Sequence, residues 1–204
     1  MADLWVFGYG SLIWKPGFPF LEQRRATLFG FHRALCVYSV RYRGTSARPG
    51  LVFGLDAGGF CEGMAFRVAP EDAATTIAYL RDREQVTGVY RAERRLVELV
   101  HGAGDVRALA FTANRYHPQY AGRLPAETQM RVVRAARGVS GPNAEYVRNT
   151  AEHLAELGVR DRQVALVSSM LGRTSGALPY PRTQVAPLPP DRALRCGYQR
   201  NLTV

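Results

Sequence analysis

Two glycines flank one aromatic residue directly after a short apolar run, in the segment Phe7-Gly8-Tyr9-Gly10-Ser11-Leu12. Glycine lets a backbone turn sharply, so successive N–H groups in such a turn can face an anion or a developing oxyanion. A dinucleotide fingerprint would need a third glycine at position 13, which is Ile13. A nucleophile elbow would need Gly-x-Ser-x-Gly around Ser11, and Leu12 and Ile13 do not complete it. The segment is therefore either a ligand-binding loop or an ordinary tight turn.

A carboxylate, Glu84, falls on the apolar side of a helix predicted over residues 70–85, which starts with proline and two acids. Ile77 and Glu84 lie two helical turns apart on one face. Burial would raise the pKa of this carboxyl, which prepares it as a general base near neutral pH. A salt bridge to Arg81 or Arg83 at the helix end is the alternative interpretation.

Cationic and aromatic side chains that could hold a small acidic substrate occur in two loops. Arg41 and Arg43 precede a turn at Gly44, and Tyr120 follows an aromatic loop segment. Arginine can bind a carboxylate through two parallel hydrogen bonds, and tyrosine offers a hydroxyl on a rigid ring. Taken singly, each of these residues is more often a surface residue than a ligand contact.

Neither metal nor disulfide chemistry is indicated. Three histidines share no ligand spacing with one another or with a carboxylate cluster: His32, His101 and His153. The three cysteines are odd in number and lack a Cys-x-x-Cys pair: Cys36, Cys61 and Cys196. We therefore expect no metal and a reducing, cytoplasmic compartment.

The apolar pattern predicts strands first and helices later, which is typical of an α+β fold. At least five strands are expected before residue 113, within residues 4–7, 34–40, 51–55, 61–68, 94–100 and 106–112. Beyond them, residues 125–136 form a second predicted helix. Asn143 is the expected N-cap of a third, and Asp161 of a fourth that turns Val164, Val167 and Leu171 inward.

The chain has 204 residues, a formal net charge of +10 and 26 arginines against a single lysine, Lys15. A positive balance of this size can indicate nucleic-acid binding, but the arginines are scattered rather than clustered, so we expect no nucleic-acid partner. No apolar run is long enough for a membrane helix, and the first residues lack the pattern of a signal peptide. We expect one catalytic domain over residues 1–173 and a flexible, proline-rich tail over residues 174–204.

Four groups of residues form recognisable motifs: Trp5-Val6-Phe7-Gly8-Tyr9-Gly10-Ser11-Leu12-Ile13-Trp14-Lys15, Arg43-Gly44 with Pro49-Gly50, Tyr79-Leu80-Arg81-Asp82-Arg83-Glu84 with Tyr90-Arg91, and Gly141-Pro142-Asn143-Ala144-Glu145-Tyr146. With these motifs the sequence resembles the ChaC-like, glutathione-specific γ-glutamylcyclotransferases over about residues 4–171. The resemblance implies a mixed, barrel-like β-sheet with flanking helices. It further implies a substrate loop made by Tyr9, Gly10, Ser11 and Leu12, and Glu84 as the catalytic acid/base.

The implied reaction cleaves glutathione to 5-oxoproline and Cys-Gly by attack of the substrate's own α-amine on its γ-amide. Such a reaction needs no nucleophilic side chain, metal or cofactor. On this interpretation Arg43 is a candidate contact for a substrate carboxylate, and Tyr120 and Tyr146 are candidates for lining the pocket. A cyclotransferase for other γ-glutamyl amides is the alternative within the enzymes, and an arginine-rich nucleic-acid-binding protein is the alternative outside them.

Overall fold

The computed structural model describes residues 3–85, 87–100 and 104–172. Five strands close into a barrel in the order β1-β3-β2-β4-β5: β1 (Leu4–Gly8), β2 (Glu22–Ser39), β3 (Gly50–Val68), β4 (Tyr90–Leu99) and β5 (Asp105–Ala113). The neighbours pair antiparallel except β1 with β5, which are parallel and complete the barrel. The α+β fold with a mixed, barrel-like sheet, expected from the sequence, is confirmed.

Two long, bent strands replace three of the predicted short ones. β3 runs without a break through residues 51–55 and 61–68, because Gly58 and Gly59 adopt positive φ angles where β3 has one residue more than β2. β2 begins at Glu22, twelve residues before the predicted strand. Its first part was not predicted because three charged residues, Glu22, Arg24 and Arg25, interrupt the apolar pattern there and form surface ion pairs, such as Arg25 with Glu62.

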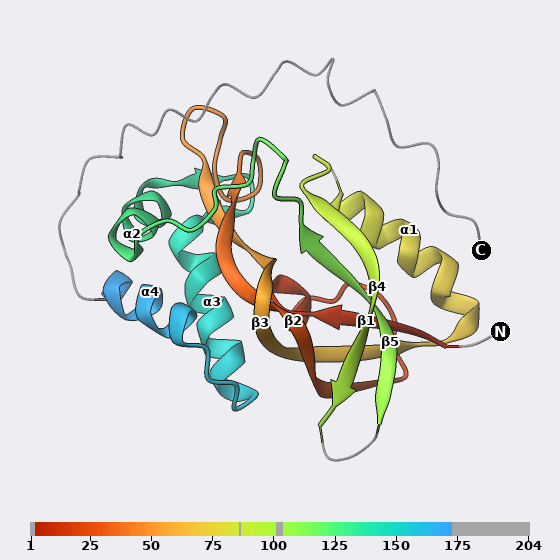
Figure 1. The fold of residues 1–204 in the computed structure, drawn as a ribbon. Coiled ribbons are helices and arrows are strands. Elements are labelled where there is room, and N and C mark those ends of the chain that lie inside the picture. Colours follow the sequence, from red (N-terminus) through yellow and green to blue (C-terminus); the bar gives the residue numbers. More distant parts are fainter. Residues whose placement is uncertain (1–2, 86, 101–103, 173–204) are drawn as a thin grey trace.

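The helices lie on two sides of the barrel (Figure 1). A 3-10 turn (η2, Pro70–Asp72) leads into α1 (Ala73–Glu84), which packs on one side, and α2 (Ala126–Ala135), α3 (Asn143–Glu156) and α4 (Arg162–Gly172) gather on the other. A further 3-10 turn, η1 (Ser11–Ile13), follows β1, and the two-residue strands β6 (Arg137–Gly138) and β7 (Gly141–Pro142) pair before α3. The predicted starts of the four helices are confirmed to within three residues.

The predicted caps of the last two helices have different outcomes. Asp161 does cap α4, because its Oδ1 accepts hydrogen bonds from the amides of Gln163 and Val164. Asn143 is not the N-cap of α3: it is the first helical residue, and its side chain crosses to β3. There its Oδ1 accepts from the Leu51 amide at 2.6 Å and its Nδ2 donates to the Leu51 carbonyl at 2.7 Å. The amide side chain thus binds helix α3 to the barrel.

The core fills the barrel and continues between β3 and the helices α2 to α4. None of the helices in the described part of the chain combines the length and the hydropathy that a membrane span requires. The predicted tail over residues 174–204 lies outside the described residues.

Candidate active site

A cavity of about 610 Å³ lies where the turn after β1, the end of α1 and the adjoining parts of β2, β3 and α3 meet. Seven of the eight residues predicted as site residues line it: Tyr9, Gly10, Ser11, Leu12, Arg43, Glu84 and Tyr146. Segments that are up to 137 residues apart in the sequence therefore contribute to one site. Glu84 is the single acidic residue of the described lining, whereas Lys15, Arg41, Arg43 and Arg83 are basic.

The loop of residues 9–12 presents unused backbone donors. The amides of Gly10, Ser11 and Leu12 donate to no acceptor within the described residues, while the carbonyls of Gly10 and Ser11 are bound inside the turn. A Cβ added to Gly10 would lie 3.3 Å from the Tyr146 hydroxyl, so this glycine borders the cavity closely. Free amide donors beside a cavity are what a ligand-binding loop would provide.

Glu84 ends α1 and faces this cavity. Burial raises the pKa of its carboxyl above the ordinary value, and the neighbouring Arg83 guanidinium offsets part of that rise. The Nε atom of Arg83 lies 3.1 Å from Oε1 of Glu84. The carboxylate therefore lines the cavity and is also ion-paired with Arg83.

Arg83 joins Glu84 to the 9–12 loop. Its guanidinium donates to the Ser11 hydroxyl at 2.9 Å, to the Lys15 carbonyl at 2.6 Å and to the Tyr79 hydroxyl at 2.9 Å. The end of α1 is thereby held against the turn that follows β1. The position of the carboxylate relative to the free amides depends on this arginine.

Three tyrosines lie near the carboxylate, Tyr9 and Tyr146 buried and Tyr90 half-buried, and desolvation raises the pKa of each hydroxyl. The Tyr9 hydroxyl donates to the Phe111 carbonyl and the Tyr90 hydroxyl to the Phe53 carbonyl, each at 2.8 Å. The Tyr146 hydroxyl instead accepts from the Phe53 amide at 3.2 Å. Its own proton has no acceptor among the described residues, so it can be donated to a molecule in the cavity.

Arg43 lines the cavity with its guanidinium over the Tyr146 ring, 5.6 Å from the ring centroid. It is held by close packing of two backbone segments: a Cβ on Gly44 would lie 2.1 Å from the Gly50 amide nitrogen, and one on Gly50 would lie 2.2 Å from the Arg43 carbonyl oxygen. The two glycines therefore allow the turn that places Arg43. One hydrogen bond, to the Pro142 carbonyl at 3.2 Å, leaves donors of the guanidinium for a ligand.

Tyr120, the eighth predicted site residue, does not line this cavity. Its hydroxyl donates to Asp56 at 2.9 Å, and Asp56 is also bound by Arg115 at 2.6 Å. Tyr120 instead packs beside Val37 and Cys36, next to the isolated bridge that it forms with Val37.

Sequence reasoning assigned no site role to Tyr90, Gln119 or Phe53, all of which line the cavity. Gln119 exchanges two bonds with Tyr38, and Phe53 binds two tyrosines through its backbone. Contacts made through backbone atoms cannot be predicted from the type of residue. For Tyr90 a signal existed, because it belongs to one of the motifs that carry the family resemblance.

Comparison with known proteins agrees with this geometry. The model of the ChaC-like protein family matches residues 4–173. The chain belongs to the ChaC-like family. A glutathione-specific γ-glutamylcyclotransferase of Escherichia coli K12 is 35% identical over 160 residues, which cover 78% of this chain and 69% of that protein. The human glutathione-specific γ-glutamylcyclotransferase 1 is 33% identical over 175 residues, covering 83% and 78%.

The ChaC-like fold is also seen in a solved structure. The crystal structure of a yeast γ-glutamyl cyclotransferase specific to glutathione superimposes with a TM-score of 0.78, covering 84% of this chain and 96% of that one at 21% identity. At this identity the likeness concerns the fold. It places the whole described barrel, with its helices, within that fold.

Proposed function

We propose that this ChaC-like protein is a glutathione-specific γ-glutamylcyclotransferase that releases 5-oxoproline and Cys-Gly. One observation carries the proposal: Glu84, a carboxylate whose pKa is raised by desolvation, shares a cation-lined cavity with the unpaired amides of the 9–12 loop. The names of the E. coli and human relatives support the same activity.

The reaction requires that the site fold the substrate and move one proton. The α-amine nitrogen of the γ-glutamyl group forms a bond to the γ-carbonyl carbon, and the bond from that carbon to the cysteine nitrogen breaks. The attacking group is the neutral amine, so the α-ammonium first loses one proton to solvent. As the new C–N bond forms, Glu84 takes a second proton from the attacking nitrogen and delivers it to the departing cysteine nitrogen, which leaves a neutral lactam and the free amine of Cys-Gly. Because nucleophile and electrophile belong to one molecule, holding them in contact lowers much of the barrier.

The charges of the cavity suit glutathione, which carries two carboxylates and one ammonium group. The amides of the 9–12 loop can receive the oxygen on which negative charge develops. Arg43 has free donors for a carboxylate, and the Tyr146 hydroxyl has a free proton for a substrate oxygen. Glu84 is the single acidic group of the described lining, so the ammonium group of the substrate is expected to lie beside it.

Product analysis tests this proposal. Purified protein incubated with glutathione is expected to release 5-oxoproline and Cys-Gly in equal amounts. Parallel assays with γ-glutamyl dipeptides such as γ-glutamylalanine measure selectivity. If kcat/KM for these dipeptides were comparable to that for glutathione, the substrate class would be γ-glutamyl amides in general rather than glutathione alone. No 5-oxoproline from any of them would overturn the activity.

A cytoplasmic site of action and the absence of a nucleic-acid partner belong to the same proposal. Within the described residues both cysteines, Cys36 and Cys61, are free thiols, as expected in the reducing compartment where glutathione is plentiful. Nucleic-acid binding would appear as steeply salt-dependent association with duplex DNA or RNA. Such binding at physiological salt would contradict this part of the proposal.

A further inference from the structure

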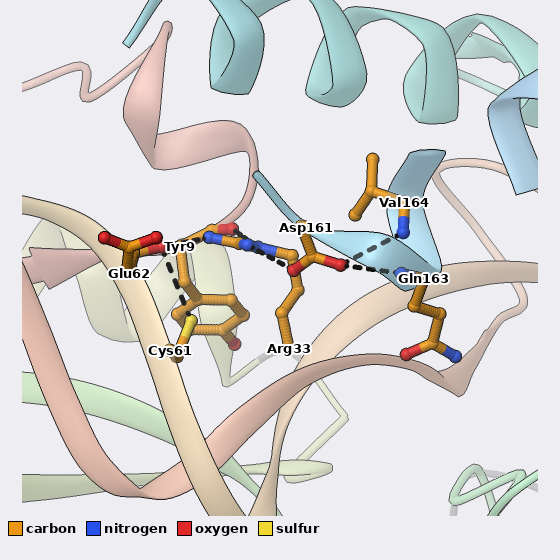
Figure 2. A network of polar contacts seen from close by, with 7 residues as sticks. All are labelled: Tyr9, Arg33, Cys61, Glu62, Asp161, Gln163 and Val164. Carbon is orange, nitrogen blue, oxygen red and sulfur yellow. Dashed lines mark hydrogen bonds and ion pairs between the residues drawn. The ribbon is translucent and has the colours of Figure 1, made fainter. Parts of the chain in front are cut away.

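A buried arginine outside the cavity is bound to the back of the substrate loop (Figure 2). Arg33 comes from β2 and is 3% exposed. Its Nε donates to the Tyr9 carbonyl at 2.6 Å, its Nη2 to the Glu62 carbonyl at 2.5 Å and its Nη1 to the Asp161 carboxylate at 2.6 Å. One guanidinium thus connects the 9–12 loop, strand β3 and the start of α4.

Asp161 links this arginine to the helix. One carboxylate oxygen binds Arg33, and the other accepts the first amides of α4, from Gln163 and Val164. The orientation of the Arg33 guanidinium is therefore set by a helix that contributes no residue to the described lining of the cavity.

We propose that Arg33 and Asp161 are positioning residues that hold the Tyr9–Gly10 peptide with the Gly10 amide directed into the cavity; this inference rests on the proposed function. In a trans peptide the C=O and the next N–H point in opposite directions. Because the Tyr9 carbonyl is drawn to Arg33, the Gly10 N–H points away from Arg33. Gly10 lines the cavity and Arg33 does not, so this direction leads into the site.

The alternative orientation is easily reached in this loop unless something prevents it. A flip of the Tyr9–Gly10 peptide needs a large change of φ at residue 10, which glycine tolerates better than any other residue. The flip would direct the Tyr9 carbonyl into the cavity, where its partial negative charge would repel a substrate carboxylate or oxyanion. Arg33 opposes the flip with a charge-assisted hydrogen bond, which is stronger than a bond between neutral groups.

The other hydrogen bond that holds Tyr9, made by its side-chain hydroxyl, does not fix the orientation of the Tyr9–Gly10 peptide. The Tyr9 hydroxyl is bound to the Phe111 carbonyl on β5, which fixes the ring. The bond from ring to backbone still leaves the peptide free to rotate. The hydrogen bond from Arg33 is therefore the interaction that selects the donor orientation of Gly10.

Three variants test the inference with kcat/KM for glutathione. Arg33→Lys keeps the positive charge, but lysine lacks the planar guanidinium that reaches three acceptors at once. We expect kcat/KM to fall about 10- to 100-fold, which is less than the fall caused by removing a direct oxyanion donor. Asp161→Asn keeps the cap of α4 but weakens the ion pair, and a fall of about 3- to 10-fold is expected. The double variant should be no worse than Arg33→Lys, because Asp161 acts through Arg33.

Val167→Ala is the matched control for stability, because Val167 is buried on α4 and has no role in the network. It should lower the melting temperature while leaving kcat/KM within about twofold of wild type. The acid limb of the pH profile should stay in place in Arg33→Lys, since Glu84 is untouched. Unchanged kcat/KM in Arg33→Lys, or losses in all three variants that follow their melting temperatures, would overturn the inference.

The amide resonance of Gly10 separates this inference from the proposed function. In NMR spectra of the full chain, Arg33→Lys and Asp161→Asn should shift this resonance, whereas Val167→Ala should not. If the wild type released no 5-oxoproline, the proposed function would fall and the resonance would still decide the orientation of the peptide. An unmoved Gly10 resonance in Arg33→Lys would overturn the inference whatever the activity.

Discussion

Asn143→Ala removes the side chain that binds helix α3 to the barrel. The two polar atoms of Asn143 satisfy both backbone groups of Leu51, and both residues are fully buried. The neighbouring strand cannot replace the lost partners, because Tyr38, paired with Leu51, directs its own amide and carbonyl to Gln119. An alanine at position 143 therefore leaves a buried donor and a buried acceptor unpaired.

Each unpaired buried group costs about 1–3 kcal/mol, so the free energy of unfolding should fall by about 2–6 kcal/mol. For a domain of this size that corresponds to a melting temperature lower by about 5–20 °C. Activity should fall as well, at temperatures where the variant is folded. The reason is that Tyr146 follows Asn143 by one turn and accepts its hydrogen bond from the same strand, at Phe53.

Urea unfolding followed by circular dichroism measures this change, with Thr150→Val as the matched control. Thr150 is equally buried on the same helix, but its hydroxyl donates to the Tyr146 carbonyl within α3. We expect Thr150→Val to cost about 1 kcal/mol or less, since a single hydrogen bond is lost and no backbone group loses its helical partner. If Asn143→Ala were as stable as Thr150→Val, the assigned role of the Leu51 contacts would be refuted.

Three further substitutions probe the site. Arg83→Met removes the cation that lowers the pKa of Glu84, so that pKa rises further and the acid limb of kcat/KM moves to higher pH; a limb at lower pH would contradict the assignment. Tyr146→Phe removes the free hydroxyl proton and orphans the Phe53 amide, so we expect kcat/KM to fall about tenfold or more with a loss of about 1 kcal/mol of stability. Gly10→Ala places a methyl group against Tyr146, and calorimetric titration with glutathione should show weaker binding.

The fold was predictable where pattern and burial coincide. The inward positions of α4 and its Asp161 cap follow from helical spacing and capping chemistry, and both are present. The strands were least predictable where charged residues interrupt the apolar pattern, as at the start of β2, and where two glycines bend one strand, as in β3. Alternation of apolar and polar residues reports on burial, and it is interrupted at both places.

The candidate site was predictable from residue types that carry chemistry, and much less from residues that act through the backbone. The 9–12 loop and Glu84 combine an unusual sequence with a recognisable task. The residues that hold them in place have no such signature in the sequence. Arg33 is one of 26 scattered arginines and is distinguished only by its three acceptors in the structure, and Asn143 has the sequence context of a helix cap. Tyr120 fitted the chemistry of a substrate contact, yet tertiary structure directs its hydroxyl to Asp56.

The most direct test of the central claim is the rate of 5-oxoproline release from glutathione by wild type and Glu84→Gln, measured side by side. Glu93→Gln is the matched control, because that glutamate lies on β4, is paired with Arg95 and does not line the cavity. The account predicts that Glu84→Gln folds with an unchanged circular dichroism spectrum and retains less than about one hundredth of the wild-type kcat, while Glu93→Gln remains active. Full activity of Glu84→Gln would contradict the assignment of Glu84 as the acid/base of the reaction.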